Sequence, residues 1–247
     1  MSIAEKLLAI EKEQSTLLST IQFEEKVSYI YNPLDYAKEP HECYVQKYCN
    51  SEKKVLFLGM NPGPFGMAQN GVPFGDSTYV NNWLQIEGNV LKPEREHPKR
   101  QIQGLNCKRS EVSGSRFWSF LKDVCGEPAR FFRHCYVHNY CPISMMTETA
   151  KNVTPADLKS PAKKQIIDIC DESLFKVLTL LNIKFIVGIG KFAEVRASQV
   201  VKSYSLDVTV VGIMHPSPIN PAANKGWKDI VSEQLKTCGI VNYLLCV

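Results

Sequence analysis

The sequence predicts an α/β sandwich built around a mostly parallel sheet. Four short apolar runs, at residues 55–58, 135–138, 185–190 and 208–214, have the pattern of buried strands. Segments with helical spacing of apolar residues alternate with these runs, which is typical of parallel sheets. There is no internal repeat and no obvious linker in the 247 residues, so we expect one domain over residues 1–247.

The first element expected is an amphipathic helix over residues 3–21, packed on the body of the domain. Residues 22–50 and 147–163 are expected to be loop-rich, and the polar segment 92–114 carries two basic pairs, Lys99-Arg100 and Lys108-Arg109. Further helices are predicted over residues 78–91, 116–125, 164–181, 191–204 and 227–238.

Charge and cysteine content set broad limits on function. The formal net charge of +4 permits a polyanionic partner without requiring one. Nine cysteines, odd in number and without a C-x-x-C pair, indicate reduced thiols inside a cell, and a metal cluster of distant cysteines is the less favoured alternative. We therefore expect no metal and no cofactor. Charged residues interrupt the first apolar positions and no apolar run could span a bilayer, so neither a signal peptide nor a membrane partner is expected.

Three of the four predicted strands end in a polar residue with a proline close behind it. These residues are Asn61, Asn139 and His215. Because the carboxyl ends of parallel strands share one edge of a sheet, the three side chains are expected to converge on one pocket. Taken singly, each has a plain alternative: a helix cap, a turn residue and a buried imidazole.

Two amides and one imidazole suit a reaction in which the leaving group departs as an anion held by hydrogen bonds. The loop at residues 59–67 contains no carboxylate, so no strong general base is expected there. A nucleophile elbow, a Walker loop, a dinucleotide-binding glycine fingerprint and the zinc deaminase signature are all absent from the sequence.

Five segments together resemble the single-strand-selective monofunctional uracil-DNA glycosylases. They are Gly59-Met-Asn-Pro-Gly-Pro-Phe-Gly-Met-Ala-Gln69, Gly71-Val-Pro-Phe-Gly75, residues 112–118, residues 138–142 and His215-Pro-Ser-Pro-Ile-Asn-Pro221 with Asn224-Lys-Gly-Trp227. The resemblance implies a three-layer α/β/α fold. It also implies DNA repair by removal of uracil and 5-hydroxymethyluracil from single- and double-stranded DNA. The product is an abasic site without strand cleavage, and the enzyme is expected to be a monomer.

The same resemblance implies roles for individual residues. Asn61 would orient the attacking water, and His215 would donate a hydrogen bond to uracil O2. Phe74 would stack on the flipped base, and Asn139 would pair with N3–H and O4. Met60, Gly63 and Met67 would line the base pocket; Gly63 stands where related enzymes carry a tyrosine, which implies room beside C5 of the base.

DNA contacts are implied for two loops. The residues are Lys151, Asn152, Lys163, Ser217, Pro218, Ile219, Asn220 and Lys225. Ile219 departs from the family pattern, which has an arginine there. An apolar wedge can still unstack bases, but a positive charge is lost.

Three other functions remain open at this stage. They are a mismatch-specific uracil or thymine glycosylase of the same superfamily, a catalytically silent nucleic-acid-binding module, and a small-molecule amidohydrolase or Rossmann-type enzyme. The expected location is the nucleus if the source is a eukaryote and the cytoplasm otherwise.

Overall fold

The computed structural model describes residues 1–245, and its centre is a four-stranded parallel sheet. The strand order is β3 (Cys135–Asn139), β2 (Val55–Gly59), β6 (Phe185–Ile189) and β7 (Thr209–Ile213). Strands β3 and β7 are the two edges of this sheet; β2 and β3 are buried along their whole length, whereas β7 is more exposed. The four predicted strands and their parallel arrangement are confirmed.

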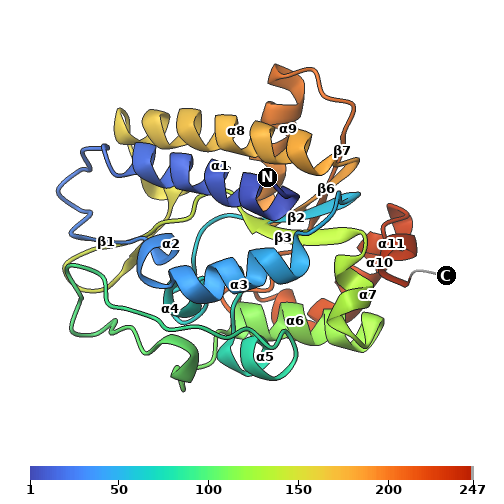
Figure 1. The fold of residues 1–247 in the computed structure, drawn as a ribbon, viewed down its shortest axis with the longest axis horizontal. Helices are drawn as coiled ribbons and strands as arrows, with labels where there is room; N and C mark the ends of the chain where they lie inside the picture. Colours follow the sequence, from blue (N-terminus) through green and yellow to red (C-terminus); the bar gives the residue numbers. More distant parts are fainter. Residues whose placement is uncertain (246–247) are drawn as a thin grey trace.

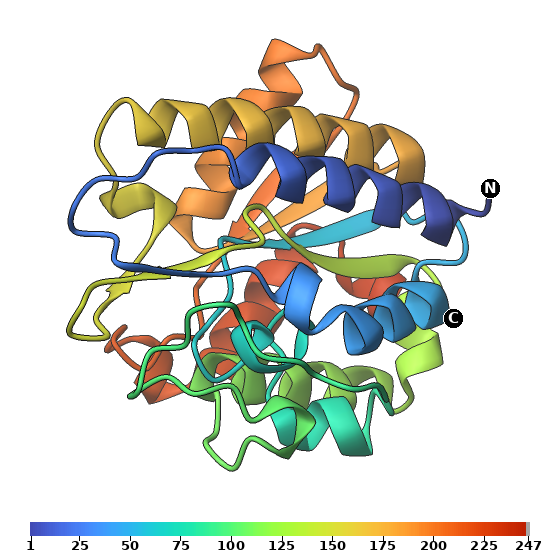
Figure 2. The same cartoon turned by 60° about the vertical axis from the view of Figure 1, so that its left-hand side comes forward.

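Helices cover both faces of this sheet, as Figures 1 and 2 show. On one face lie α1 (Ile3–Leu18), α8 (Ala162–Leu181) and α9 (Lys191–Ser203). On the other lie α3 (Lys38–Tyr48), α5 (Ser77–Asn82), α6 (Val112–Cys125) and α10 (Trp227–Thr237). The three-layer α/β/α architecture is therefore confirmed.

A second, antiparallel sheet extends from the carboxyl end of β3. It consists of β1 (Tyr29–Tyr31), β4 (Ser144–Met146) and β5 (Asn152–Val153), with β4 in the middle. The shorter elements are α2 (Pro33–Tyr36), α4 (Met67–Asn70), α7 (Pro128–Phe132) and α11 (Val241–Leu245), with 3-10 turns η1 (Gly104–Asn106), η2 (Pro155–Asp157) and η3 (Ala223–Lys225).

The largest differences from the predicted elements are in two segments. Residues 22–50 contain β1, α2 and the eleven-residue helix α3, because His41, Tyr44, Val45 and Tyr48 form a buried stripe at helical spacing that includes polar-tipped side chains. The helix expected over residues 78–91 ends at Asn82. Beyond it, the Leu84 carbonyl accepts hydrogen bonds from Tyr48 Oη (2.7 Å) and Lys47 Nζ (3.1 Å), and tertiary contacts replace helical ones.

Helix α1 begins with a capping box in which the Ser2 hydroxyl accepts from the Glu5 backbone and the Glu5 carboxylate accepts from the Ser2 backbone. It ends at Leu18, three residues earlier than predicted. Its inner face carries polar as well as apolar residues. Gln14 Nε2 donates to the Tyr140 carbonyl at 3.0 Å, directly beyond the end of β3.

The same face of α1 carries a buried carboxylate between two histidines. Glu11 Oε2 lies 2.7 Å from His41 Nε2, and Glu11 Oε1 lies 3.6 Å from His138 Nδ1 on β3. The other ring nitrogen of His41 donates to the Gly71 carbonyl at 2.8 Å. Burial alone disfavours the charged forms, but their mutual attraction outweighs it: the pKa of Glu11 is lowered and the pKa of His41 is raised. Glu11 and His41 therefore form an ion pair, whereas burial lowers the pKa of His138 and keeps that ring neutral.

Among the described residues, Cys43, Cys49, Cys107, Cys141, Cys170 and Cys238 are free thiols, and Cys246 lies outside the described residues. No helix in the same range is long and apolar enough to cross a bilayer.

Candidate active site

A cleft of about 820 Å³ opens at the carboxyl ends of the parallel strands. All seven residues predicted for catalysis or base binding line it: Met60, Asn61, Gly63, Met67, Phe74, Asn139 and His215. They come from chain segments up to 155 residues apart, and the parallel register brings them together, with Gly59 of β2 paired opposite Asn139 of β3.

Asn139 presents a buried acceptor to the cleft. Its side chain is only 4% exposed, and its Oδ1 has no hydrogen-bond partner among the described residues. Its Nδ2 donates to the Met67 sulfur at 3.1 Å. Because a thioether sulfur can accept but not donate, Met67 favours the amide orientation that leaves the carbonyl oxygen toward the cleft. A buried polar atom left unpaired costs about 1–3 kcal/mol, so this oxygen is prepared for a donor from a ligand.

Phe74 forms an aromatic wall of the cleft. Its ring stacks on Phe117 of α6 at 4.9 Å and lies 6.2 Å from the His215 ring. The backbone of Phe74 has a positive φ of 54°. Helix α6 approaches this backbone at Gly114, where a Cβ would lie 2.0 Å from the Phe74 carbonyl oxygen. The ring is therefore held from behind, which leaves its other side to the cleft.

The tautomer of His215 follows from its contacts. The Ser217 backbone N–H donates to His215 Nδ1 at 3.1 Å, so the proton of the neutral ring is on Nε2. Burial lowers the pKa of His215 from its ordinary value, which favours this neutral form. The ring can therefore donate one hydrogen bond through Nε2 without carrying a charge.

Arg116 of α6 fastens the loop that follows His215. Its guanidinium donates to the Pro216 carbonyl at 3.0 Å and to Asn224 Oδ1 at 2.8 Å. Asn224 in turn donates to the Pro218 carbonyl at 2.9 Å. This positioning function was not predicted, although Arg116 lies in one of the segments that carry the resemblance.

Glu111 was also missed. It lies directly before α6, far from the 59–67 loop in the sequence, yet its carboxyl group faces the cleft beside that loop. An ideal Cβ on Gly63 would lie 2.6 Å from Glu111 Oε2, and one on Gly66 would lie 2.9 Å from Glu111 Cγ. Burial raises the pKa of Glu111, while hydrogen bonds from the Ser113 and Phe65 backbone oppose the shift. The 59–67 loop itself contains no carboxylate, but Glu111 brings one into the cleft from another segment of the chain.

Comparisons with known proteins decide the family. Residues 46–236 match the model of the uracil DNA glycosylase superfamily. The chain is 50% identical over 243 residues to the single-strand selective monofunctional uracil-DNA glycosylase of Rattus norvegicus, covering 98% of this chain and 87% of the rat protein. The proteins of the same name from Mus musculus and Bos taurus are 49% and 47% identical, again over 98% of this chain and over 87% and 89% of theirs. The chain belongs to the single-strand-selective monofunctional uracil-DNA glycosylases.

The fold agrees with this uracil-DNA glycosylase family. The crystal structure of wild-type SMUG2 from Pedobacter heparinus superposes with a TM-score of 0.69, covering 98% of this chain and 99% of that one. The sequence identity of that pair is 19%, so the likeness concerns the fold alone.

The residues predicted to contact DNA fall into two groups in this uracil-DNA glycosylase. Asn152, Ser217, Pro218, Ile219 and Asn220 line the cleft. Ile219 is 91% exposed, and its role as an apolar wedge stays a prediction. Lys151, Lys163 and Lys225 do not line the cleft, and Lys163 Nζ folds back onto the Ala156 carbonyl at 2.9 Å.

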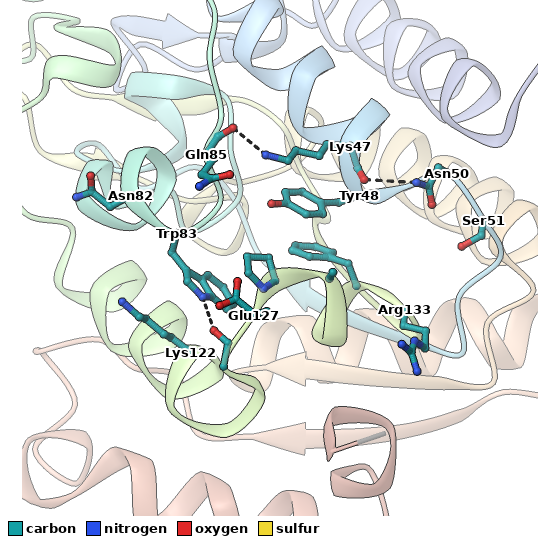
Figure 3. Close-up of a pocket in the computed structure, with 14 residues that line it drawn as sticks. Lys47, Tyr48, Asn50, Ser51, Asn82, Trp83, Gln85, Lys122, Glu127 and Arg133 are labelled. Carbon is teal, nitrogen blue, oxygen red and sulfur yellow. Dashed lines mark hydrogen bonds between the residues drawn. The ribbon is translucent and has the colours of Figure 1, made fainter. Parts of the chain in front are cut away.

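A second cavity lies where β2 and β3 begin, away from the strand ends that carry the site residues. Figure 3 shows its lining, which includes Lys47, Tyr48, Trp83, Lys122 and Arg133. Tyr48 and Phe132 stack directly on each other there, with ring centres 3.9 Å apart and planes 18° apart. The two rings leave no slot between them for a base, so the cleft at the carboxyl ends is the candidate active site.

Proposed function

We propose that this enzyme hydrolyses the N-glycosidic bond of uracil in single- and double-stranded DNA, leaving an abasic site and an intact strand. The observation that carries the proposal is the unpaired, buried Oδ1 of Asn139 in a cleft with an aromatic wall. Uracil N3–H can donate a hydrogen bond to the Asn139 oxygen. Cytosine cannot, because its N3 carries no proton. The family membership supports the same substrate.

The reaction needs few protein groups. The target base leaves the stack and enters the cleft, where Phe74 stacks on it and Asn139 reads its N3–H and O4. The bond between N1 and C1′ breaks, and its electron pair leaves with the base. His215 Nε2–H donates to O2, where negative charge develops; such a preorganised donor contributes about 2.7–4 kcal/mol.

Water completes the reaction. Asn61 follows β2 and lines the cleft; its amide orients a water toward C1′. The oxygen of that water forms the new bond to C1′ as uracil leaves with the electron pair on N1, and the proton that the water loses passes to solvent. A Schiff base requires an amine, and the described residues that line the cleft include no lysine. Cleavage of the DNA strand is therefore not part of the proposal.

The proposal extends to 5-hydroxymethyluracil. The space beside Gly63, expected to be open, is partly occupied by the Glu111 carboxyl group. A carboxylate accepts a hydrogen bond from a hydroxymethyl group but gains nothing from the methyl group of thymine. We expect Glu111→Ala to reduce release of 5-hydroxymethyluracil more than release of uracil, measured on matched oligonucleotides.

The test is incubation with an end-labelled oligonucleotide that contains one uracil, followed by alkali to cleave abasic sites. We expect uracil release from single strands and duplexes, and no strand cleavage before alkali. Asn61→Ala should abolish it. The matched control is Asn82→Ala, because Asn82 is exposed and lines the second cavity (Figure 3).

The alternatives predict different results. A mismatch-specific glycosylase would act only on duplexes, and a silent binding module would bind DNA without releasing uracil. Equal activity of Asn61→Ala and Asn82→Ala would contradict the assignment of Asn61.

A further inference from the structure

Two arginines from separate basic pairs lie on one aromatic ring. The guanidinium carbons of Arg100 and Arg109 are 4.9 and 4.0 Å from the centre of the Phe65 ring. They are therefore less than 9 Å from each other. The folded chain thus brings together the basic pairs 99–100 and 108–109, to which the activity described above assigns no function.

These two charges are not neutralised by a carboxylate. Among the ion pairs of residues 1–245, none includes Arg100 or Arg109. Nearby acids have other partners: Glu96 pairs with Lys92 and Glu148 with Arg95. Within residues 1–245, the Arg100 guanidinium donates to one partner, the Ala150 carbonyl, at 3.1 Å. Attraction to the ring face offsets part of the repulsion between the two cations and holds them in place.

The pair lies at the mouth of the cleft. Phe65 and Arg109 line it, and Arg109 is the one arginine or lysine among its described lining residues. Through Ala150, Arg100 is joined to the turn between β4 and β5, which carries Lys151 and leads into Asn152 of β5. The exposed wedge residue Ile219 contributes no charge, so positive charge at the cleft comes from the segment of residues 100–109.

We propose that Arg100 and Arg109, held on Phe65, bind neighbouring phosphates of the DNA strand beside the flipped nucleotide. A planar guanidinium presents paired N–H donors that match phosphate oxygens, and an unneutralised pair gains more from an anion than a paired one would. This inference rests on the proposed function, because it assigns the phosphates to the strand that carries the target base.

The test is the salt dependence of single-strand binding. Fluorescence anisotropy of a labelled thymine oligonucleotide is measured between 25 and 200 mM KCl for the wild type, Arg100→Ala, Arg109→Ala and the double variant. Each lost phosphate contact should make the slope of log K against log[salt] shallower by about 0.7. For the double variant, the change in affinity across this range should be about 18-fold smaller than for the wild type.

Two further variants make the test specific. Arg109→Lys keeps the charge and should keep most of the wild-type slope. Arg133→Ala removes an exposed arginine of the second cavity, seen in Figure 3, and should leave the slope unchanged. Uracil release at saturating oligonucleotide should stay at the wild-type level in Arg133→Ala, with circular dichroism confirming the fold of every variant.

The outcomes separate this inference from the proposed function. Uracil release by the wild type together with equal salt slopes for Arg109→Ala and Arg133→Ala would overturn the phosphate site and leave the proposed function intact. A lower rate of uracil release at saturating oligonucleotide, without a change in the salt slope, would also overturn the phosphate site. That result would show that the arginines only pack against the 62–66 loop. If the double variant does not fold, Arg109→Ala alone decides, since Arg109 is exposed. Failure of the wild type to release uracil would instead refute the proposed function.

Discussion

Replacing Gly59 by alanine tests whether Asn139 and Phe74 together hold the base. Gly59 ends β2, and an ideal Cβ there would lie 2.2 Å from Asn139 Oδ1 and 2.8 Å from Phe74 Cε2. Real Cβ contacts are essentially never shorter than 3.0 Å. The Asn139 oxygen must therefore retreat by about 0.8 Å, the difference between 2.2 and 3.0 Å, and the phenyl ring by about 0.2 Å.

The expected effects on stability and activity differ in size. Both neighbours of the new methyl group are ends of side chains, so the overpacking should cost about 1–3 kcal/mol of unfolding free energy. The same atoms are the proposed reading and stacking groups. A displacement near 1 Å at such groups costs about 100-fold in rate, or about 2.7 kcal/mol in the barrier.

The assay is single-turnover release of uracil from a single-stranded oligonucleotide, with thermal unfolding measured in parallel. Gly212→Ala, on the edge strand β7, is the control: its Cβ would meet Glu194 Oε2 at 2.5 Å, at the end of a flexible side chain of α9. We expect Gly212→Ala to excise uracil at nearly the wild-type rate. A folded Gly59→Ala that does the same would refute the roles of Asn139 and Phe74. Equal losses in both variants would instead indicate general destabilisation.

Three further predictions concern titratable groups. Uracil release should persist as the pH drops below the ordinary His pKa of 6.5 and fall only as the pH drops through the lowered pKa of His215, because a protonated Nδ1 cannot accept from Ser217 N–H; a loss of activity centred at or above pH 6.5 would contradict this. Glu11→Ala should lower the free energy of unfolding by about 3–5 kcal/mol, since it leaves the His41 charge buried and unpaired. Denaturant unfolding measures it, and a loss below 1 kcal/mol would show that the pair is not charged. Because the pKa of Glu111 is raised in the folded protein, its ionisation costs stability as the pH rises through that pKa. Glu111→Gln should therefore unfold at a higher temperature than the wild type at pH 7, with the gain vanishing below the unfolded pKa of about 4.3, and a variant less stable at every pH would exclude it.

Sequence patterns predicted the parts of the site that are local to strand ends. Asn61, Asn139 and His215 each follow a buried apolar run, and parallel strands bring such positions to one edge whatever the connecting segments do. The resemblance added Phe74, which lies on a turn that no periodicity describes. All four line the same cleft.

The missing parts depend on contacts between segments that have no pattern of their own. Glu111 reaches the 59–67 loop only because Gly63 and Gly66 lack a Cβ. Neither the sequence around Glu111 nor that of the loop indicates that these two segments are in contact. The positioning function of Arg116 was not predicted because an arginine on an amphipathic helix is normally solvated. Helix α3 was missed because its buried stripe consists of His41 and tyrosines as well as Val45, and such residues also anchor loops.

The contacts of α1 place the first eighteen residues directly behind the strand end that carries Asn139. Glu11 reaches His138 and Gln14 reaches the Tyr140 carbonyl, so the helix supports both chain neighbours of Asn139. The superfamily match begins only at residue 46, and these supports therefore lie outside the shared body of the enzyme. A shortened protein that starts after Leu18 would lack both contacts while keeping every residue that lines the cleft. Such a protein would show how far the accuracy of base recognition is set from behind the sheet.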